Sequence, residues 1–509
     1  MMTRRHIAVI VLGDVGRSPR MQYHALSLLE HGYFVSLVGY EGEELIPQLE
    51  QANEWANNTT DGTDPKKVPL LQVLRFTPYA PPISLKKGLL PVYLILRVLG
   101  LLFSLCSAFA KLAMHGEQNV KVDCILVQNP PSIPLLLSTF IYCKYQSLSA
   151  HETGFVIDWH NLGYTMFDVS PNHPIRKIAK FYEKMLATRA DCHMCVTDSM
   201  KKWLIANFGI TNGNSITVLH DRPPDQFCPT TLEKQHDLMK RIQPQIMEQF
   251  NPGVAKTVLE KGFETDKTLL TQVHIEKDGS RRMVVPRDGR PIMIVSSTSW
   301  TPDENFSILL DALVLFDKKM SEIASSGHTK VSHYLVIVTG KGPQKTMYQK
   351  KIKELNLQNV SIVTLWLEAS DYPTLLGCAD LGVSLHVSTS GLDLPMKVLD
   401  MFGCEVPVCA VDFSCLGELV QDERNGRVFS SSDVLSRQLL ELLADSERDE
   451  DGKMTGGLLE EYRERIKGMR RWRENWIENA LPTILLACKN GEETGRNRNR
   501  IQETRMKER

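Results

Sequence analysis

Short apolar segments alternate with helical patterns along most of this chain, and no other feature constrains its fold as strongly. In the first half these segments are Ile7–Leu12, Phe34–Gly39, Asp123–Gln128, Gly154–Trp159 and Ala190–Thr197. Continuous apolar segments are typical of strands that are buried on both faces, as in parallel sheets. The helices between them supply the crossovers that parallel strands need. The pattern predicts an α/β fold with a doubly wound parallel sheet.

A second alternating unit follows, with apolar segments at Pro291–Ser296, Tyr334–Thr339, Val360–Val363 and Leu381–Ser384. A polar stretch with weak periodicity separates the two units. We therefore expect an N-terminal domain of residues 1–220, a linker and insertion of residues 221–290, and a C-terminal domain of residues 291–488. The basic tail, residues 489–509, is expected to be disordered.

The composition excludes several classes of protein. The 509 residues include 59 Lys and Arg against 60 Asp and Glu, a net charge of −1. Such a balance gives no basic field, so we expect no nucleic-acid partner. The apolar content of 42% and the charged content of 23% are those of a globular protein rather than a disordered one. Eleven scattered cysteines indicate a reducing compartment rather than a disulfide framework.

The most apolar segment, Leu89–Ala113, lies within Pro65–Gly116, which contains no acidic residue. Its polar or small positions fall on one stripe of a helix: Arg97, Gly100, Ser104, Ser107 and Lys111. One interpretation is a core helix whose stripe faces a neighbour or a little water. The other is a helix in the membrane interface, attracted by the surrounding cations. The second predicts membrane contacts by Arg97, Leu101, Leu102, Leu105, Phe109 and Lys111.

The loop after the first apolar segment contains Gly13, Asp14, Gly16 and Arg17, and Arg20 follows it. The glycines allow close backbone approach, the next helix offers free N–H groups, and the arginines suit phosphate oxygens. A dinucleotide fingerprint is absent because valine occupies the second glycine position. A carboxylate here would repel phosphate. Asp14 is therefore either a catalytic base or a cap of the turn.

Two segments of the second half predict a phosphate site. Lys341 and Gly342 follow an apolar segment, as in a phosphate cradle.

The other segment is Ser390–Gly403, where Ser390 and Gly391 bring the backbone close to an anion, and Pro395 begins a helix. Lys397 supplies a positive charge, and Asp400, three residues on, could accept hydrogen bonds from ribose hydroxyls. This arrangement suits a nucleoside diphosphate.

Several long motifs in this order resemble the chitobiosyldiphosphodolichol beta-mannosyltransferase family. They are Val11–Tyr23, Gln128–Pro131, Ile157–Tyr164, Ser296–Leu310, Thr339–Pro343 and Ser390–Gly403. The resemblance covers about residues 5–485. It implies the GT-B architecture, two Rossmann-like domains facing a central cleft, with the acceptor and the membrane on the N-terminal domain and GDP-mannose on the C-terminal one. It also implies transfer of the first mannose of the N-glycan precursor from GDP-mannose to dolichyl-diphosphate di-N-acetylglucosamine, on the cytosolic face of the endoplasmic reticulum membrane.

The implied reaction converts an alpha linkage to a beta-1,4 linkage, so it is a single displacement that needs a base. By analogy with other inverting GT-B enzymes, Asp14 is the first candidate. Asp158 and His160 are the alternatives, and His160 could be a base oriented by Asp158. The resemblance implies no cofactor and no essential metal, because helix dipoles and cations bind the leaving diphosphate in such enzymes.

Other questions stay open at this point. Members of the family usually begin with a hydrophobic signal anchor, whereas this chain begins near its first strand. We expect either attachment through Leu89–Ala113 or a truncated start. Two alternatives to a beta-mannosyltransferase stay open. One is a catalytically silent membrane scaffold of a mannosyltransferase complex, and the other is a GT-B transferase with another lipid acceptor or nucleotide sugar. Other mannosyltransferases are candidate partners.

Overall fold

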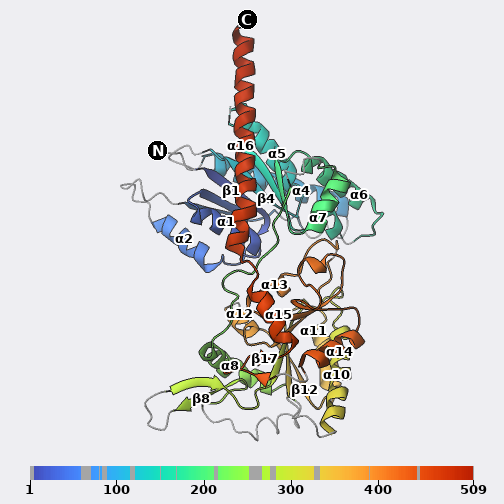
Figure 1. Ribbon diagram of the computed structural model, residues 1–509. Helices are drawn as coiled ribbons and strands as arrows, with labels where there is room; N and C mark the ends of the chain where they lie inside the picture. Colours follow the sequence, from blue (N-terminus) through green and yellow to red (C-terminus); the bar gives the residue numbers. More distant parts are fainter. Residues whose placement is uncertain are drawn as a thin grey trace. The chain divides into compact units, whose positions relative to one another are not determined.

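The computed structural model contains two compact units, residues 1–220 with 473–509 and residues 221–472 (Figure 1). It describes residues 5–58, 70–79, 81–82, 89–114, 121–149, 151–167, 169–210, 216–250, 266–275, 282–325, 333–368, 370–388, 390–443 and 447–507. Within these ranges the side chains of residues 55–58, 90–91, 113–114 and 490–507 are not described.

The first unit is built on a seven-stranded parallel sheet in the order β3-β2-β1-β4-β5-β6-β7. Its strands are β1 (His6–Asp14), β2 (Phe34–Tyr40), β3 (Leu71–Phe76), β4 (Cys124–Asn129), β5 (Gly154–Trp159), β6 (Cys192–Cys195) and β7 (Ile216–Val218). The central strands are buried on both faces, as their continuous apolar sequences predict. The order reverses at β1, so the loops after β1 and β4 meet at the carboxyl edge of the sheet, the usual place of a site in such folds.

The helices of this unit cover both faces of the sheet. They are α1 (Pro19–Glu30), α2 (Pro47–Asn58), α4 (Leu90–Met114), α5 (Leu135–Leu148), the short η1 (Gly163–Met166), α6 (Pro174–Ala187), α7 (Asp198–Phe208) and α16 (Trp472–Lys507). Consecutive helices α4, α5, α6 and α7 contact one another in turn. This is the arrangement that right-handed crossovers give when successive strands are added in one direction.

Helix α16 departs from the expected domain boundaries, because residues 473–488 belong to the first unit. The Trp476 indole N–H donates to Nδ1 of His24 over 2.9 Å, and the Thr483 and Thr217 hydroxyls are 2.7 Å apart. The apolar face of the helix is buried there at Trp476, Ala480, Ile484 and Ala487. The tail expected to be disordered also continues this helix to Lys507.

The second unit is built on a six-stranded parallel sheet in the order β12-β11-β10-β13-β14-β15. Its strands are β10 (Ile292–Ser297), β11 (Tyr334–Thr339), β12 (Val360–Leu365), β13 (Leu381–Ser384), β14 (Val408–Val411) and β15 (Gly426–Phe429). Its helices are α8 (Leu232–Met247), α10 (Ser307–Ser325), α11 (Lys345–Glu354), α12 (Asp371–Leu376), α13 (Met396–Gly403), η3 (Leu416–Glu418), α14 (Ser432–Leu443) and α15 (Leu458–Lys467). Two small antiparallel ribbons pair β8 (Thr271–Ile275) with β9 (Arg282–Pro286) and β16 (Glu447–Arg448) with β17 (Met454–Thr455).

Residues 221–290, expected to be a linker and insertion, belong to the second unit and contain α8 and the β8–β9 ribbon. The Thr231 side chain caps α8 by accepting from the Lys234 amide. Four apolar residues of this helix enter the core of the unit: Leu238, Met239, Ile242 and Ile246. These four residues recur at helical spacing, but they lie among polar residues and close to Pro244, which weakens the periodic signal in the sequence.

The structure of α4 agrees with the core-helix interpretation at some residues and leaves others exposed. Three of the expected membrane-contacting side chains, Leu101, Leu105 and Phe109, are buried, and Phe109 stacks on Tyr142 of α5 at 4.8 Å. Leu102 is half-buried, whereas Arg97 and Lys111 are exposed. Among the described residues α4 is the one helix long and apolar enough to cross a membrane, although core helices meet the same criterion.

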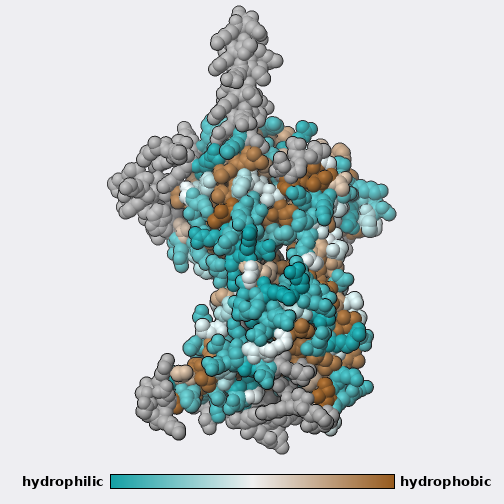
Figure 2. Space-filling model, in the orientation of Figure 1, coloured by the Kyte–Doolittle hydropathy of each residue, from teal (hydrophilic) through white to brown (hydrophobic). Residues whose placement is uncertain are grey.

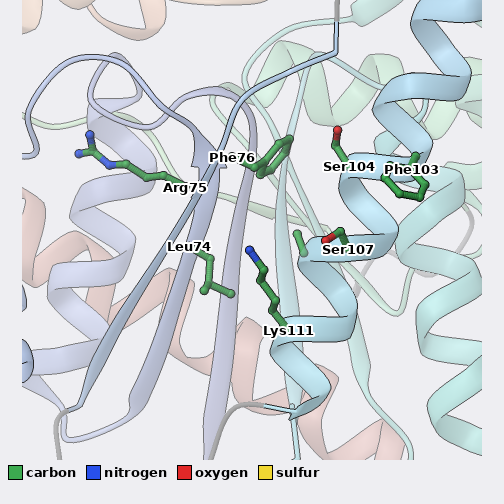
Figure 3. Close-up of a pocket in the computed structure, with 8 residues that line it drawn as sticks. Leu74, Arg75, Phe76, Phe103, Ser104, Ser107 and Lys111 are labelled. Carbon is green, nitrogen blue, oxygen red and sulfur yellow. The ribbon is translucent and has the colours of Figure 1, made fainter. Parts of the chain in front are cut away.

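The polar stripe of α4 faces β3, at the edge of the sheet. Ser104, Ser107 and Lys111 line a hollow of about 150 Å³ whose opposite wall includes Leu74 and Phe76. Figure 3 shows Lys111 on the side of α4 that faces this strand. The stripe therefore faces a neighbour, as the core-helix interpretation predicts.

Candidate functional site

Asp14 lies at the end of β1, and its carboxylate holds two loops together. Oδ1 accepts from the Gly16 amide and Oδ2 from the Glu43 amide, each over 3.0 Å. A Cβ at Gly16 would lie 2.5 Å from the Glu43 carbonyl oxygen, so only glycine allows this approach. The exposed Arg17 side chain pairs with Glu43 over 2.7 Å. Both oxygens of Asp14 thus have structural partners, as a turn cap requires.

Arg20 does not have the phosphate-binding position that its sequence context suggested. It is buried, and its guanidinium binds both carboxylate oxygens of Asp158, Nε to Oδ2 over 2.7 Å and Nη2 to Oδ1 over 2.9 Å. Nη1 also donates to the Leu219 carbonyl over 2.9 Å. The first turn of α1 lies against the end of β5, and this turns the arginine inward.

Asp158 is fully buried at the centre of this network and is ionised. Burial alone would raise the pKa of its carboxyl, but Arg20, His160 and His24 together hold that pKa well below its usual range. Nε2 of His24 lies 3.2 Å from Asp158 Oδ2. Because the Trp476 indole donates to Nδ1 of His24, the proton of that ring is on Nε2 and points at Asp158. Burial also lowers the pKa of His24, so this ring is neutral.

His160 follows β5 and is the member of this network that reaches solvent. Its Nε2 lies 2.9 Å from Oδ2 of Asp158, and its side chain is 23% exposed. Since Asp158 is an ionised acceptor, Nε2 of His160 donates to it and carries the ring proton. The lone pair of Nδ1 then points away from Asp158, and no other described residue hydrogen-bonds to this atom. An oriented histidine with a free lone pair is what a general base requires.

Glu183 of α6 fixes the neighbouring loops and was not predicted from the sequence. Its Oε1 accepts from Ser132 Oγ over 2.6 Å, from Asn129 Nδ2 over 3.1 Å and from the Gly163 amide over 2.9 Å. Burial raises the pKa of this carboxyl, and these hydrogen bonds act in the opposite direction. The loops after β4 and β5 are therefore joined beneath His160.

In the second unit Glu304 is the centre of the candidate anion site, and it too was not singled out from the sequence. Its Oε1 accepts from Lys397 Nζ over 2.6 Å, and Oε2 accepts from Thr298 Oγ1 and the Ser299 amide, each over 2.6 Å. Burial would raise the pKa of Glu304, but the side chains of His386, Lys397 and Thr298 hold that pKa well below its usual range. The one signal for Glu304 in the sequence is its position within the family motif Ser296–Leu310.

The loops after β10 and β11 touch where glycine leaves room for a close approach. A Cβ at Gly342 would lie 1.8 Å from the Ser299 carbonyl oxygen, and Gly340 has a φ of +126°. The Nζ of Lys341 lies 3.5 Å from the centre of the Trp366 ring, in a cation–π contact. Lys341 and Gly342 are thus next to the Thr298–Ser299 backbone that binds Glu304.

The segment before α13 turns at Gly391. Gly391 has a φ of +72°, and its amide donates to Ser388 Oγ over 2.9 Å. Ser390 Oγ donates to Asp393 Oδ1 over 3.2 Å. Lys397 is in the first turn of α13, where a helix N-terminus attracts anions.

Asp400 lies one turn further along α13, and burial raises the pKa of its carboxyl to about 7 although Lys397 acts in the opposite direction. His386 Nε2 is buried without a hydrogen-bond partner among the described residues. An unpartnered buried donor or acceptor beside Lys397 and Glu304 indicates room for a polar ligand.

Comparison with known proteins identifies the family. The family model "Glycosyl transferases group 1" matches residues 280–456, within the second unit. The chain is 38% identical over 486 residues to the Homo sapiens chitobiosyldiphosphodolichol beta-mannosyltransferase, covering 94% of this chain and 93% of the relative. The chain belongs to the chitobiosyldiphosphodolichol beta-mannosyltransferase family. The Dictyostelium discoideum enzyme of that name is 37% identical over 499 residues, covering 92% of each chain.

Further relatives define the class of enzyme and the fold. An Arabidopsis thaliana protein named UDP-glycosyltransferase TURAN is 40% identical over 499 residues, covering 95% of this chain and 98% of the relative. The crystal structure of Anabaena HepE in complex with UDP and glucose has a TM-score of 0.53 at 14% identity, covering 94% of this chain and 98% of that one. A Rickettsia africae glycosyltransferase structure has a TM-score of 0.52 at 12% identity, covering 98% and 99%. The protein is a glycosyltransferase with the GT-B fold.

Proposed function

We propose that this protein transfers mannose from GDP-mannose to dolichyl-diphosphate di-N-acetylglucosamine, with inversion to a beta-1,4 linkage. The substrates come from the family, whose human member has the acceptor and the beta-mannosyl product in its name. The observation that carries the mechanism is the pair His160 and Asp158, in which an ionised carboxylate 2.9 Å away fixes the ring of a partly exposed histidine.

In the proposed step Nδ1 of His160 removes the proton from the acceptor hydroxyl. The hydroxyl oxygen forms a bond to the anomeric carbon of mannose, and the bond from that carbon to the diphosphate oxygen breaks. The bonding electrons leave with GDP, and one displacement inverts the anomeric centre. Asp158 stabilises the imidazolium that forms, and Arg20, His24 and Trp476 keep Asp158 in place.

Asp14 is a weaker candidate for the base, because its two oxygens already accept from the Gly16 and Glu43 amides. Asp158 cannot take this role directly, since it is buried and has three partners. We therefore assign the base to His160, and we assign positioning roles to Asp158 and Asp14.

The second unit is proposed to bind the donor. Lys397 and the first turn of α13 stabilise the charge that develops on the leaving diphosphate, and Lys341 with the Gly342 backbone extends the cradle. Asp400 is proposed to accept from the ribose hydroxyls. Because these cations and amides neutralise the diphosphate, we propose that transfer needs no metal or other cofactor, so that activity persists in EDTA.

The site of action is proposed to be the cytosolic face of the endoplasmic reticulum membrane, because the acceptor named for the relatives is a dolichol-linked diphosphate. The test is incubation of the purified protein with a short phytanyl-diphosphate chitobiose and, in parallel, GDP-mannose or UDP sugars. We expect one hexose to be added from GDP-mannose alone and to be released by a beta-mannosidase.

A second candidate is a transferase that uses a UDP sugar, and the name of the Arabidopsis relative favours it. Transfer from a UDP sugar and not from GDP-mannose would establish this candidate. Transfer from no donor would support the silent scaffold.

A further inference from the structure

The first unit has an unusual surface where three neighbouring helices each expose large apolar side chains. On α4 four exposed apolar residues recur at helical spacing and form one stripe: Val92, Ile95, Leu99 and Phe103. Phe103 is 79% exposed. This stripe is distinct from the buried side at Leu101 and Leu105, and at Phe103 it borders the polar side with Ser104 and Lys111.

Helix α5 contacts both α4 and α6, and α5 and α6 each carry an exposed apolar stripe as well. On α5 the stripe is Ile141, Tyr145 and Leu148, and Leu148 is 84% exposed. On α6 it is Ile175, Ile178, Phe181 and Met185, and Phe181 is 67% exposed. In Figure 1 these helices lie to the right of α16 in the first unit, and Figure 2 shows hydrophobic side chains on the visible surface of that unit. We call these eleven positions on three helices the apolar face.

The exposed charges on α4, α5 and α6 themselves are all positive. The helices α4 and α5 contain no acidic residue, and the one acidic residue of α6, Glu183, is buried in its loop network. Cations border the stripes on α5 and α6: Lys144, Lys177, Lys180 and Lys184. None of them forms an ion pair with another described residue. On α6 the lysines lie along one side of the stripe, the pattern of a helix that lies in a membrane interface.

We propose that the apolar face is a membrane-docking surface, on which α4, α5 and α6 lie in the plane of an anionic bilayer with their stripes among the lipid acyl chains. A partner protein with an apolar interface would be expected to supply acidic residues opposite these cations, whereas a phospholipid surface supplies both the apolar layer and the negative charge. Helix α4 packs on α5 along its buried side, so it contacts the membrane along its length rather than crossing it. The inference is independent of the proposed reaction, because it concerns binding to lipid without either substrate.

The test measures sedimentation of the purified full chain with vesicles of phosphatidylcholine alone or with a third of phosphatidylinositol. We expect tight binding to the anionic vesicles only. The variant Ile178→Glu/Phe181→Glu, which changes exposed side chains of α6, should bind at least about 10-fold more weakly. Replacing Lys177, Lys180 and Lys184 with Gln should weaken binding on the order of 100-fold at low salt and remove most of the salt dependence.

Two controls separate this surface from others. Val314→Glu/Met347→Glu changes two exposed apolar residues of the second unit and should leave vesicle binding unchanged. Thermal unfolding should show each variant folded like the wild type. Equal vesicle binding by the α6 variant and the wild type would overturn the proposal. So would a wild type that binds no vesicle but forms a dimer that Ile178→Glu/Phe181→Glu makes monomeric, because the apolar face would then bind a second copy.

Discussion

Replacing His160 with alanine removes the proposed base and leaves its support in place. The ring is partly exposed and makes one hydrogen bond, to Asp158 Oδ2, while Arg20 and His24 still hold that carboxylate. We therefore expect little loss of stability. The rate should fall by the contribution of a general base, roughly 10²–10⁴-fold in kcat, with kcat/KM falling in parallel and the affinity for GDP unchanged.

The matched variant is Asp14→Asn. Its amide oxygen can keep one of the two backbone hydrogen bonds, while its NH₂ group faces the other N–H. This mismatch should lower the free energy of unfolding by about 1–3 kcal/mol, whereas kcat should fall less than about 10-fold. Activity is measured as mannose transfer to the phytanyl-linked acceptor under single-turnover conditions.

Added imidazole gives a further check, since it should restore part of the activity of His160→Ala if the missing group is a base. The reasoning is refuted if His160→Ala retains a tenth or more of the wild-type kcat while Asp14→Asn falls to background. Asp14 would then be the base, and the Asp158 network would serve the fold alone.

Three further outcomes follow from the structure. Lys397→Ala should weaken GDP binding about 10- to 100-fold, measured by calorimetry, because it removes a positive charge from the diphosphate and leaves Glu304 buried without its cation. An unchanged Kd would show that GDP binds elsewhere. The pKa of Asp400 is about 7 in the folded protein against about 3.8 in the unfolded chain, so the unfolded state loses this proton at a lower pH than the folded state. The free energy of unfolding of the wild type should therefore fall as pH rises from about 4 to 7. Asp400→Asn should lack that loss in urea titrations, and parallel curves for the two proteins would contradict the assignment. Leu105→Ala should cost about 2–5 kcal/mol of unfolding free energy and Phe103→Ala less than about 1, because Leu105 is buried and Phe103 is exposed on the same helix; equal losses would show that the burial on α4 is misassigned.

The sequence by itself determined the elements of the fold that have a strong local signal. The buried strands β1, β2, β4, β5, β10, β11 and β13 were predicted within one or two residues, because continuous apolar segments have no other place than between two layers of helices. The glycines after β11 and Gly391 were singled out as places where the backbone approaches an anion, which stays a prediction. The structure shows that glycine is needed at these positions, for the approach of Gly342 to Ser299 and for the positive φ of Gly391.

Tertiary structure alone decided which of several chemically suitable residues is buried and which partner each one binds. Arg20 and Arg17 are three residues apart in one loop-to-helix segment, yet one is buried against Asp158 and the other pairs with Glu43 on the surface. Nothing local distinguishes them, because the partner of Arg20 is 138 residues away. The same holds for Trp476, which returns from the far end of the chain to hold His24.

Helix α4 shows the limit most clearly. Its sequence correctly indicates an apolar helix with one polar stripe, but apolar residues cover the rest of its circumference. Which of them face the protein depends on where α5 and β3 pack, so Leu101, Leu105 and Phe109 are buried while Val92, Leu99 and Phe103 are exposed. Hydrophobicity along a chain specifies that a surface avoids water, and only the packing of distant elements specifies what covers it.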